Sequence, residues 1–98
     1  MTKEDILHYL FTHKDEFHRK FSITKMALFG SFARGDATQS SDIDILIEME
    51  QGTQDIHEKK EAFRALVENA LQRRVDIARE KYLKPLAWEA IEKDICYV

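Results

Sequence analysis

The sequence predicts an α/β (α+β) domain, in which a short mixed sheet is covered by helices mainly on one side. Three observations support this fold class. Apolar residues recur at helical spacing in two long segments. Short apolar segments bounded by turn residues lie between and after them and predict strands. The chain has only 98 residues, with 44% hydrophobic residues, which is enough for one modest core. We therefore expect residues 1–98 to form a single domain, in the order helix, strand, strand, helix, strand, helix.

The first predicted element is a helix over residues 2–17. Thr2 and Asp5 form a weak capping box at its start. Apolar residues follow at helical spacing and predict its buried side: Ile6, Leu7, Leu10, Phe11 and Phe17.

Two strands are predicted next, with a polar connection between them. Residues 23–29 are apolar and end at a Gly-Ser pair, which favours a strand followed by a turn. Residues 31–34 can form a helical turn, and residues 35–41 are polar and predict a loop. The second strand is predicted over residues 42–48.

The C-terminal half is predicted to contain a helix, a strand and a second helix. Residues 55–71 carry an apolar stripe typical of an amphipathic helix, made of Ile56, Phe63, Leu66, Val67, Ala70 and Leu71. Residues 74–79 predict the third strand. Pro85 suits the first turn of a last helix with Leu86, Trp88, Ile91 and Ile95 on its buried side, and residues 96–98 are expected to be extended.

Charge and cysteine content exclude several classes of protein. Lys and Arg total 15 against 18 Asp and Glu, a formal net charge of −3, which argues against a protein that coats nucleic acid or an anionic membrane. The first residues lack the basic and apolar segments of a secretory signal. We expect a cytoplasmic protein without direct nucleic-acid or membrane binding. The single cysteine, Cys96, can form neither an internal disulfide nor a zinc site with other thiols.

Candidate catalytic residues begin with an Asp-x-Asp pattern on the second predicted strand. Because side chains alternate along a strand, Asp42 and Asp44 point to one face, ~7 Å apart along the backbone, while Ile43, Ile45 and Ile47 point to the core. Like charges so placed favour a divalent cation between them. Carboxylates with phosphate oxygens and water are ligands that Mg²⁺ prefers.

A third carboxylate is predicted to join this pair. Asp76 lies between Val75 and Ile77 on the third strand, so its side chain should point away from the core, toward Asp42 and Asp44 if the strands are neighbours. Three such carboxylates can hold two metal ions, one of which activates an attacking hydroxyl while the other stabilises the leaving phosphate.

A candidate phosphate site precedes the carboxylates. Gly30 and Ser31 follow a strand, where missing side-chain bulk lets backbone N–H groups and the hydroxyl approach a phosphate. Arg34 can contact phosphate oxygens or can simply be an exposed turn residue.

Residues 30–44 resemble the Gly-Ser-x10-Asp-x-Asp signature of the DNA polymerase beta-like nucleotidyltransferase superfamily. Gly-Ser-Phe-Ala-Arg-Gly followed by Ser-Asp-Ile-Asp is similar to its minimal nucleotidyltransferase (MNT) branch. The resemblance implies the nucleotidyltransferase fold, contact of Ser31 with the nucleotide triphosphate, Mg²⁺ binding by Asp42 and Asp44, and completion of the metal site by Asp76.

The resemblance also implies a function. Many minimal members are antitoxins that pair with a HEPN-domain ribonuclease toxin, which they bind and modify by transferring AMP from ATP to a tyrosine. The expected enzyme is thus a Mg²⁺-dependent protein adenylyltransferase. A homo- or hetero-oligomer is a possible assembly. Beyond the site we expect only one strand and two helices, which favours an acceptor with its own surface. Two alternatives stay open: a binding-only antitoxin with a silent site, and transfer to a small molecule.

Several other residues have both a functional and a structural interpretation. Trp88, Tyr97 and Tyr82 are candidates for docking a partner, although such a tryptophan is more often part of the core. The basic residues Arg73, Arg74, Arg79 and Lys81 can attract an anionic nucleotide, but a solvated rim is the simpler interpretation. His8, His13 and His18 lie five apart and are expected on the surface, and Asp36 is interpreted as a turn residue.

Overall fold

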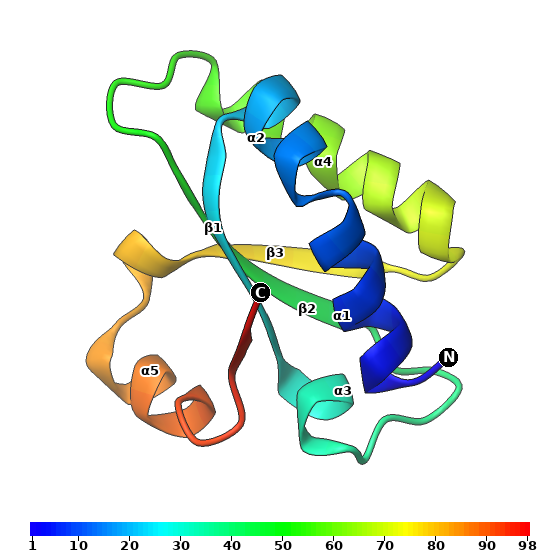
Figure 1. Cartoon of the computed structure of the whole chain (residues 1–98). Helices are drawn as coiled ribbons and strands as arrows, with labels where there is room; N and C mark the ends of the chain where they lie inside the picture. The colour runs from blue at the N-terminus through cyan, green and yellow to red at the C-terminus, as the bar shows by residue number, and fades with distance from the viewer.

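A four-stranded sheet forms the centre of the computed structural model, which describes all residues from 1 to 98 (Figure 1). The strands are β1 (Ile23–Phe29), β2 (Ile43–Met49), β3 (Val75–Arg79) and β4 (Cys96–Tyr97). The helices are α1 (Lys3–Thr12), α2 (Lys14–Phe21), α3 (Gly30–Arg34), α4 (Ile56–Leu71), the 3-10 turn η1 (Glu80–Tyr82) and α5 (Pro85–Ile91). The four segments predicted as extended are therefore confirmed, with ends that differ by at most one residue.

The sheet is mixed, as the sequence predicts. Its strand order is β3-β2-β1-β4. Strand β1 runs antiparallel to both β2 and β4, whereas β2 and β3 are parallel and are joined through α4. Parallel neighbours require such a crossover connection. The central position of β2 places its side chains beside those of both β1 and β3.

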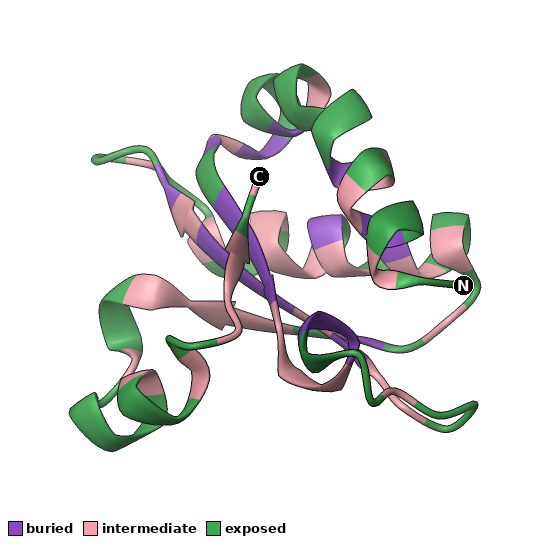
Figure 2. Cartoon of the chain, turned by 60° about the horizontal axis from the view of Figure 1, so that its bottom comes forward, coloured by how far each residue is buried: buried purple, intermediate pink, exposed green.

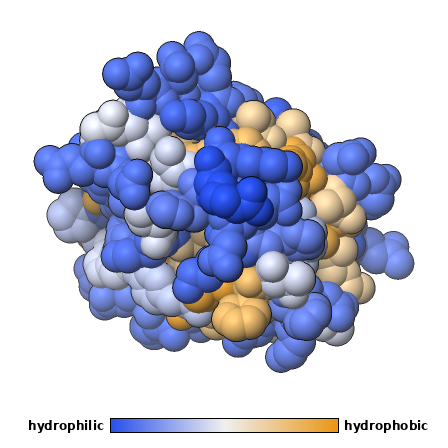
Figure 3. Space-filling view, turned by 45° about the horizontal axis from the view of Figure 1, so that its top comes forward, coloured by the Kyte–Doolittle hydropathy of each residue, from blue (hydrophilic) through white to orange (hydrophobic).

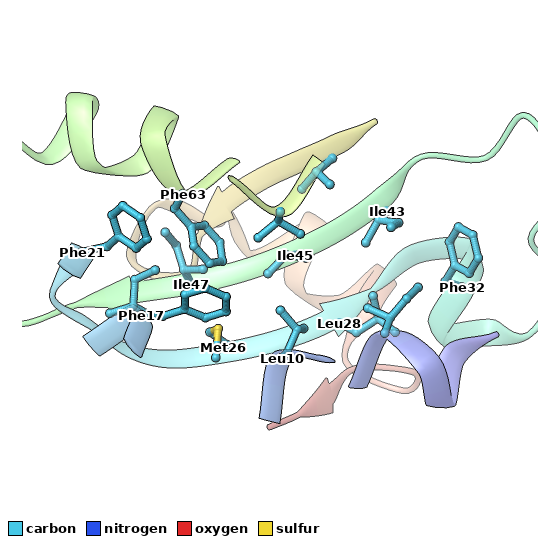
Figure 4. Packing of buried hydrophobic residues seen from close by; sticks show 14 of the residues in the cluster. Leu10, Phe17, Phe21, Met26, Leu28, Phe32, Ile43, Ile45, Ile47 and Phe63 are labelled. Carbon is cyan, nitrogen blue, oxygen red and sulfur yellow. The ribbon is translucent and has the colours of Figure 1, made fainter. Parts of the chain in front are cut away.

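The apolar core lies between the sheet and the helices α1, α2 and α4. Alternate residues of β2, namely Ile43, Ile45 and Ile47, are fully buried in it, as their period-two spacing predicts. Phe63 of α4 packs edge-on against Phe17, with ring centroids 5.0 Å apart, and Figure 4 shows these two rings next to each other. The prediction that helices cover mainly one side of the sheet is confirmed.

The N-terminal segment forms two helices, whereas the sequence predicts one. His13 ends α1 and begins α2, and its ring contacts those of Tyr9 and Phe17. No glycine or proline marks the break, so the hydrophobic period does not reveal it. The predicted capping box of α1 is confirmed. The assignment of Phe11 to the buried stripe is wrong: it is 67% exposed, because it lies about 100° around the helix from buried Leu10.

Helix α4 agrees with its prediction except at the edge of its stripe. Phe63 and Val67 are buried, and Ile56, Leu66 and Leu71 pack against the core as partly buried residues. Ala70 is exposed, contrary to its predicted place in the stripe. A narrower stripe suffices here because α1 and α2 share the cover of this face of the sheet.

The C-terminal segment is attached more loosely. Helix α5 has no buried residue, and Figure 2 shows it in exposed and intermediate colours away from the core. The prediction that Leu86 faces the core is wrong, since it is 81% exposed. Trp88, Ile91 and Ile95 are only partly buried. No residue of α5 belongs to the core cluster formed by the sheet with α1, α2 and α4, so Leu86 does not reach that core.

The outer surface carries few apolar side chains. The large exposed ones are Met1, Phe11, Tyr82, Leu86 and Tyr97. On the face shown in Figure 3, hydrophilic residues predominate and apolar residues form limited areas. None of the helices has the length and apolar character needed to span a bilayer.

Candidate active site

The turn after β1 brings the backbone against an acidic side chain. Gly30 begins α3 with a φ of 77°, a conformation that favours glycine. A Cβ atom at Gly30 would lie 2.1 Å from Oδ2 of Asp44, so no other residue fits without moving that carboxylate. The two motif positions Gly30 and Asp44 are therefore in direct contact in the folded chain, with Ser31 next to them at the start of α3.

Strand β2 positions the pair of aspartates. Asp42 directly precedes the strand and Asp44 is its second residue, and both are half-buried. In the sheet register Asp44 lies opposite Phe29 of β1 on one side and Asp76 of β3 on the other. The side chains of opposite residues in neighbouring strands share a face. The predicted approach of Asp76 to the Asp-x-Asp pair is thus confirmed, and Asp76 is exposed to solvent.

The three carboxylates repel one another. Burial, followed by the negative charges of Asp76 and Asp42, raises the pKa of Asp44 above its ordinary value of 3.8, and the positive charge of Arg34 opposes this. None of the three aspartates has a hydrogen-bonding side-chain partner or an ion pair in the structure. A strand that keeps adjacent carboxylates unneutralised favours a cationic ligand at this position.

Arg34 lies at the rim of this site. It is exposed at the end of α3, and its Nε lies 3.3 Å from Oδ2 of Asp36. The backbone N–H of Asp36 also donates to the carbonyl of Ser31. Asp36 therefore belongs to the turn, in agreement with its interpretation from the sequence, and it holds the guanidinium of Arg34 beside the turn.

The donor set fits Mg²⁺ in its chemistry, because carboxylate oxygens on a wet face are the ligands this ion takes. In this conformation, however, no three His, Cys, Asp or Glu side chains are grouped so as to bind one ion together. Asp42, Asp44 and Asp76 are the residues that could hold the metal. Their role as ligands stays a prediction.

The basic residues near Asp76 differ from the predicted solvated rim. The Arg79 guanidinium forms an ion pair with Glu48 at 2.9 Å and lies over the ring of Tyr82. Nη1 of Arg73 donates to carbonyl oxygens in the loop before Asp42. Both are therefore engaged in internal contacts, and only Arg74 and Lys81 of this group have exposed side chains without an ion pair. No local pattern could have revealed the Arg73 contacts, which span more than thirty positions.

No hydrogen bond or ion pair joins the histidines or the candidate docking residues to the three carboxylates. His13 contacts Glu16 at 3.1 Å, and His18 contacts Glu50 at 3.2 Å. Tyr97 is partly exposed and donates its hydroxyl hydrogen to Glu80. Tyr82 is exposed, whereas Trp88 is partly buried, so their docking role stays a prediction.

Comparison with known proteins agrees with this geometry. The family model described as nucleotidyltransferase domain matches residues 11–98. The chain belongs to this nucleotidyltransferase family. A Thermococcus cleftensis protein named protein adenylyltransferase MntA is 32% identical over 100 residues, covering 100% of this chain and 97% of the relative. A Methanocaldococcus jannaschii protein provisionally named a protein adenylyltransferase is 33% identical over 98 residues, covering 99% and 98% of the two chains.

Solved structures confirm the fold of this nucleotidyltransferase. One that is provisionally described as a minimal nucleotidyltransferase matches with a TM-score of 0.76 and 26% identity, over 97% of this chain and 94% of the other. A structure described as a toxin–antitoxin with AMP-PNP matches with a TM-score of 0.67 and 18% identity, over 88% and 69% of the two chains. At that identity the second match is evidence for the fold alone.

Proposed function

We propose that this nucleotidyltransferase moves AMP from Mg²⁺-ATP to a hydroxyl group, most simply a tyrosine, of a partner protein, and that it thereby acts as the antitoxin of a HEPN-type ribonuclease toxin. The observation that carries the proposal is the contact of Asp44 with Gly30, which joins the candidate phosphate turn to three unneutralised aspartates. The names of the relatives support a protein as the acceptor.

The residues have distinct roles in this proposal. The Gly30 backbone and the Ser31 hydroxyl bind the triphosphate, and Arg34 approaches its oxygens from the rim. Asp42 and Asp44 hold Mg²⁺, which when bound neutralises phosphate charge and lowers the pKa of a nearby hydroxyl. Asp76 lies at the outer strand, where it orients the acceptor hydroxyl and accepts its proton.

The bond changes follow from this arrangement. The acceptor oxygen forms a bond to the α-phosphorus while the bond from that phosphorus to the bridging oxygen of the β-phosphate breaks. Pyrophosphate leaves with the bonding electron pair. The hydroxyl proton goes to Asp76 and then to solvent, so the partner gains one AMP for each ATP consumed.

Toxin–antitoxin structures support the choice of partner. The AMP-PNP in one of them is an ATP analogue. Another is described as the pair MntA–HpeT in a mutant that replaces two aspartates, two positions apart, with glutamate. This is the spacing of Asp42 and Asp44. We propose a cytoplasmic location, where ATP and a ribonuclease toxin are both present.

The test is the intact mass of a partner protein that co-purifies with the chain from cells. A partner made with the unaltered chain should be heavier by whole AMP units than the same partner made with the double variant Asp42→Ala, Asp44→Ala. The variant Asp15→Asn, at an exposed carboxylate of α2 that has no side-chain hydrogen bond or ion pair, is the matched control and should preserve the added mass. A partner that binds both forms equally and carries no added mass would instead identify a binding-only antitoxin.

A further inference from the structure

The loop between the candidate phosphate turn and Asp42 has little support of its own. Residues 38–40 are exposed, and the loop's internal hydrogen bonds are between Thr38, Ser40 and Ser41. Ala37 is its partly buried contact with the core. A polar loop with so few internal contacts needs an outside partner to keep one conformation.

Arg73 supplies that partner. Its Nη1 atom lies 3.3 Å from the carbonyl oxygen of Thr38, 3.0 Å from that of Gln39 and 2.9 Å from that of Ser41. The two hydrogens on this nitrogen are shared among the three oxygens. Its guanidinium carbon also lies 5.1 Å from the ring centroid of Phe32, which is buried in α3 directly after Ser31. One side chain therefore joins the loop to the phosphate turn.

The backbone of the next residue, Arg74, also restrains Asp42. The backbone carbonyl of Arg74 accepts a hydrogen bond of 2.9 Å from the amide of Ile43. The Ser41 carbonyl and the Ile43 amide belong to the two peptide groups on either side of the Asp42 Cα. Residues 73 and 74 thus restrain both backbone torsions of Asp42, whose carboxylate has no hydrogen bond of its own in the structure.

We propose that Arg73 is a positioning residue, which fixes the backbone of Asp42 relative to the Gly30–Ser31 turn and so prepares the carboxylate for its ligand. Asp44 does not depend on it, because β2 pairs with strands on both sides at that position. The inference rests on the proposed function for its consequence in catalysis. The restraint on the loop stands on the contacts alone.

The experiment compares Arg73→Ala with Arg74→Ala. Both remove one positive charge, but the exposed Arg74 side chain makes none of these contacts, and its backbone carbonyl remains in the variant. Mn²⁺ affinity is measured by electron paramagnetic resonance in the presence of AMP-PNP, and exchange of the Ser41 and Ile43 amides is measured by NMR. Arg73→Ala should weaken Mn²⁺ binding by about tenfold or more and should accelerate exchange at both amides.

The Arg74→Ala control and the separate measurement of kcat and KM make the test more specific. Arg74→Ala should stay within about twofold of the unaltered chain in Mn²⁺ affinity. In AMP transfer to the co-purified partner, Arg73→Ala should lower kcat on the order of tenfold to a hundredfold, with a smaller change in KM for ATP. Arg73→Lys keeps a donor but not the planar contact with Phe32, so it should recover part of the loss.

Three outcomes would overturn the proposal: unchanged amide exchange in Arg73→Ala, unchanged Mn²⁺ affinity, or an equal loss in Arg74→Ala. If Arg73→Ala does not fold, Arg73→Lys replaces it, and unaltered exchange in that variant would count equally against the proposal. If the unaltered chain transfers no AMP while exchange responds as expected, the proposed function fails and the restraint by Arg73 stands.

Discussion

Strand β2 carries one acidic side chain near each end, and the two side chains differ in whether the fold neutralises their charge. Asp44 and Glu48 lie four residues apart on the same face of the strand. Glu48 forms an ion pair with Arg79 and accepts hydrogen bonds from the backbone amides of Met49 and Lys81. Asp44 has no ion pair, and burial and the charges of Asp76 and Asp42 raise its pKa despite the opposing charge of Arg34.

The difference separates charges that serve the fold from charges that await a ligand. Burial by itself would raise the pKa of Glu48, but the hydrogen bonds from Arg79, Met49 and Lys81 outweigh it and lower that pKa. The fold therefore has the means to neutralise a carboxylate on this strand. That it does not do so at Asp44 indicates that the negative charge there has a use.

The largest expected effect is on activity at the Asp44 end. Asp44→Asn keeps the shape of the side chain but removes the charge, so AMP transfer to the partner should fall by about a thousandfold or more, since metal binding supplies several kcal/mol of transition-state stabilisation. Stability to urea should not decrease. Transfer is measured by the mass of the partner, with Asp15→Asn, at an exposed carboxylate of α2, as control. Activity within tenfold of the unaltered chain would remove Asp44 from the mechanism.

At the other end of the strand the expected effect is on stability. Glu48→Gln removes the charged partner of Arg79, whose Nε is already buried without a hydrogen-bond partner. The free energy of unfolding should fall by about 1–3 kcal/mol, as measured by urea denaturation, while AMP transfer by the folded fraction persists. Glu50→Gln, at an exposed position whose side chain has His18 as its hydrogen-bond partner, is the control and should change stability little. If Asp44→Asn lowered the free energy of unfolding and Glu48→Gln did not, the assignment of the stabilising charge to Glu48 would be wrong.

A divalent cation should stabilise the folded chain through the Asp44 end of β2 and not through the Glu48 end. Mn²⁺ at ten times its Kd should raise the free energy of unfolding of the unaltered chain by about 1.4 kcal/mol through preferential binding to the folded state. The gain should disappear in Asp44→Asn and should remain in Glu48→Gln, in each case measured as a shift in Tm with and without the ion. Equal shifts in all three proteins would place the cation elsewhere.

The sequence predicts the Asp44 end better than the Glu48 end, and the reason is the range of the contacts. Asp42, Asp44, Gly30 and Ser31 lie within fifteen consecutive residues, so alternation along one strand and a glycine turn are enough to place them. Asp76 requires only that the two strands be neighbours, which a short helical crossover favours.

The errors of the sequence analysis arise where tertiary packing overrides a local pattern. Arg79 and Arg73 are simply basic residues in the sequence, and their partners lie more than thirty positions away. The break at His13 has no glycine or proline to mark it. Leu86 has the spacing of a buried residue, but it is exposed on a helix that contributes no residue to the core cluster.

The smallest expected effect is a difference in pH dependence between the two ends. Because the pKa of Asp44 is raised in the folded state, its ionisation disfavours folding at neutral pH. Asp44→Asn should therefore be slightly more stable than the unaltered chain at pH 7, and this advantage should vanish as the pH falls through the raised pKa toward 3.8. Glu48 has a lowered pKa, so its stabilisation is complete above the ordinary value of 4.5 and is lost only as the pH falls through the folded-state pKa.

The two variants should thus differ from the unaltered chain with opposite signs at neutral pH. The deficit of Glu48→Gln should shrink as the pH falls below 4.5, and the advantage of Asp44→Asn should shrink as the pH falls toward 3.8. Urea denaturation in metal-free buffer at several pH values between neutrality and the onset of acid unfolding measures both differences. Saturating Mn²⁺ should reverse the sign for Asp44 alone, because the bound cation turns a repelled carboxylate into a ligand that stabilises the folded state. A Glu48→Gln variant with no deficit at neutral pH would contradict the assignment of the neutralised charge to Glu48.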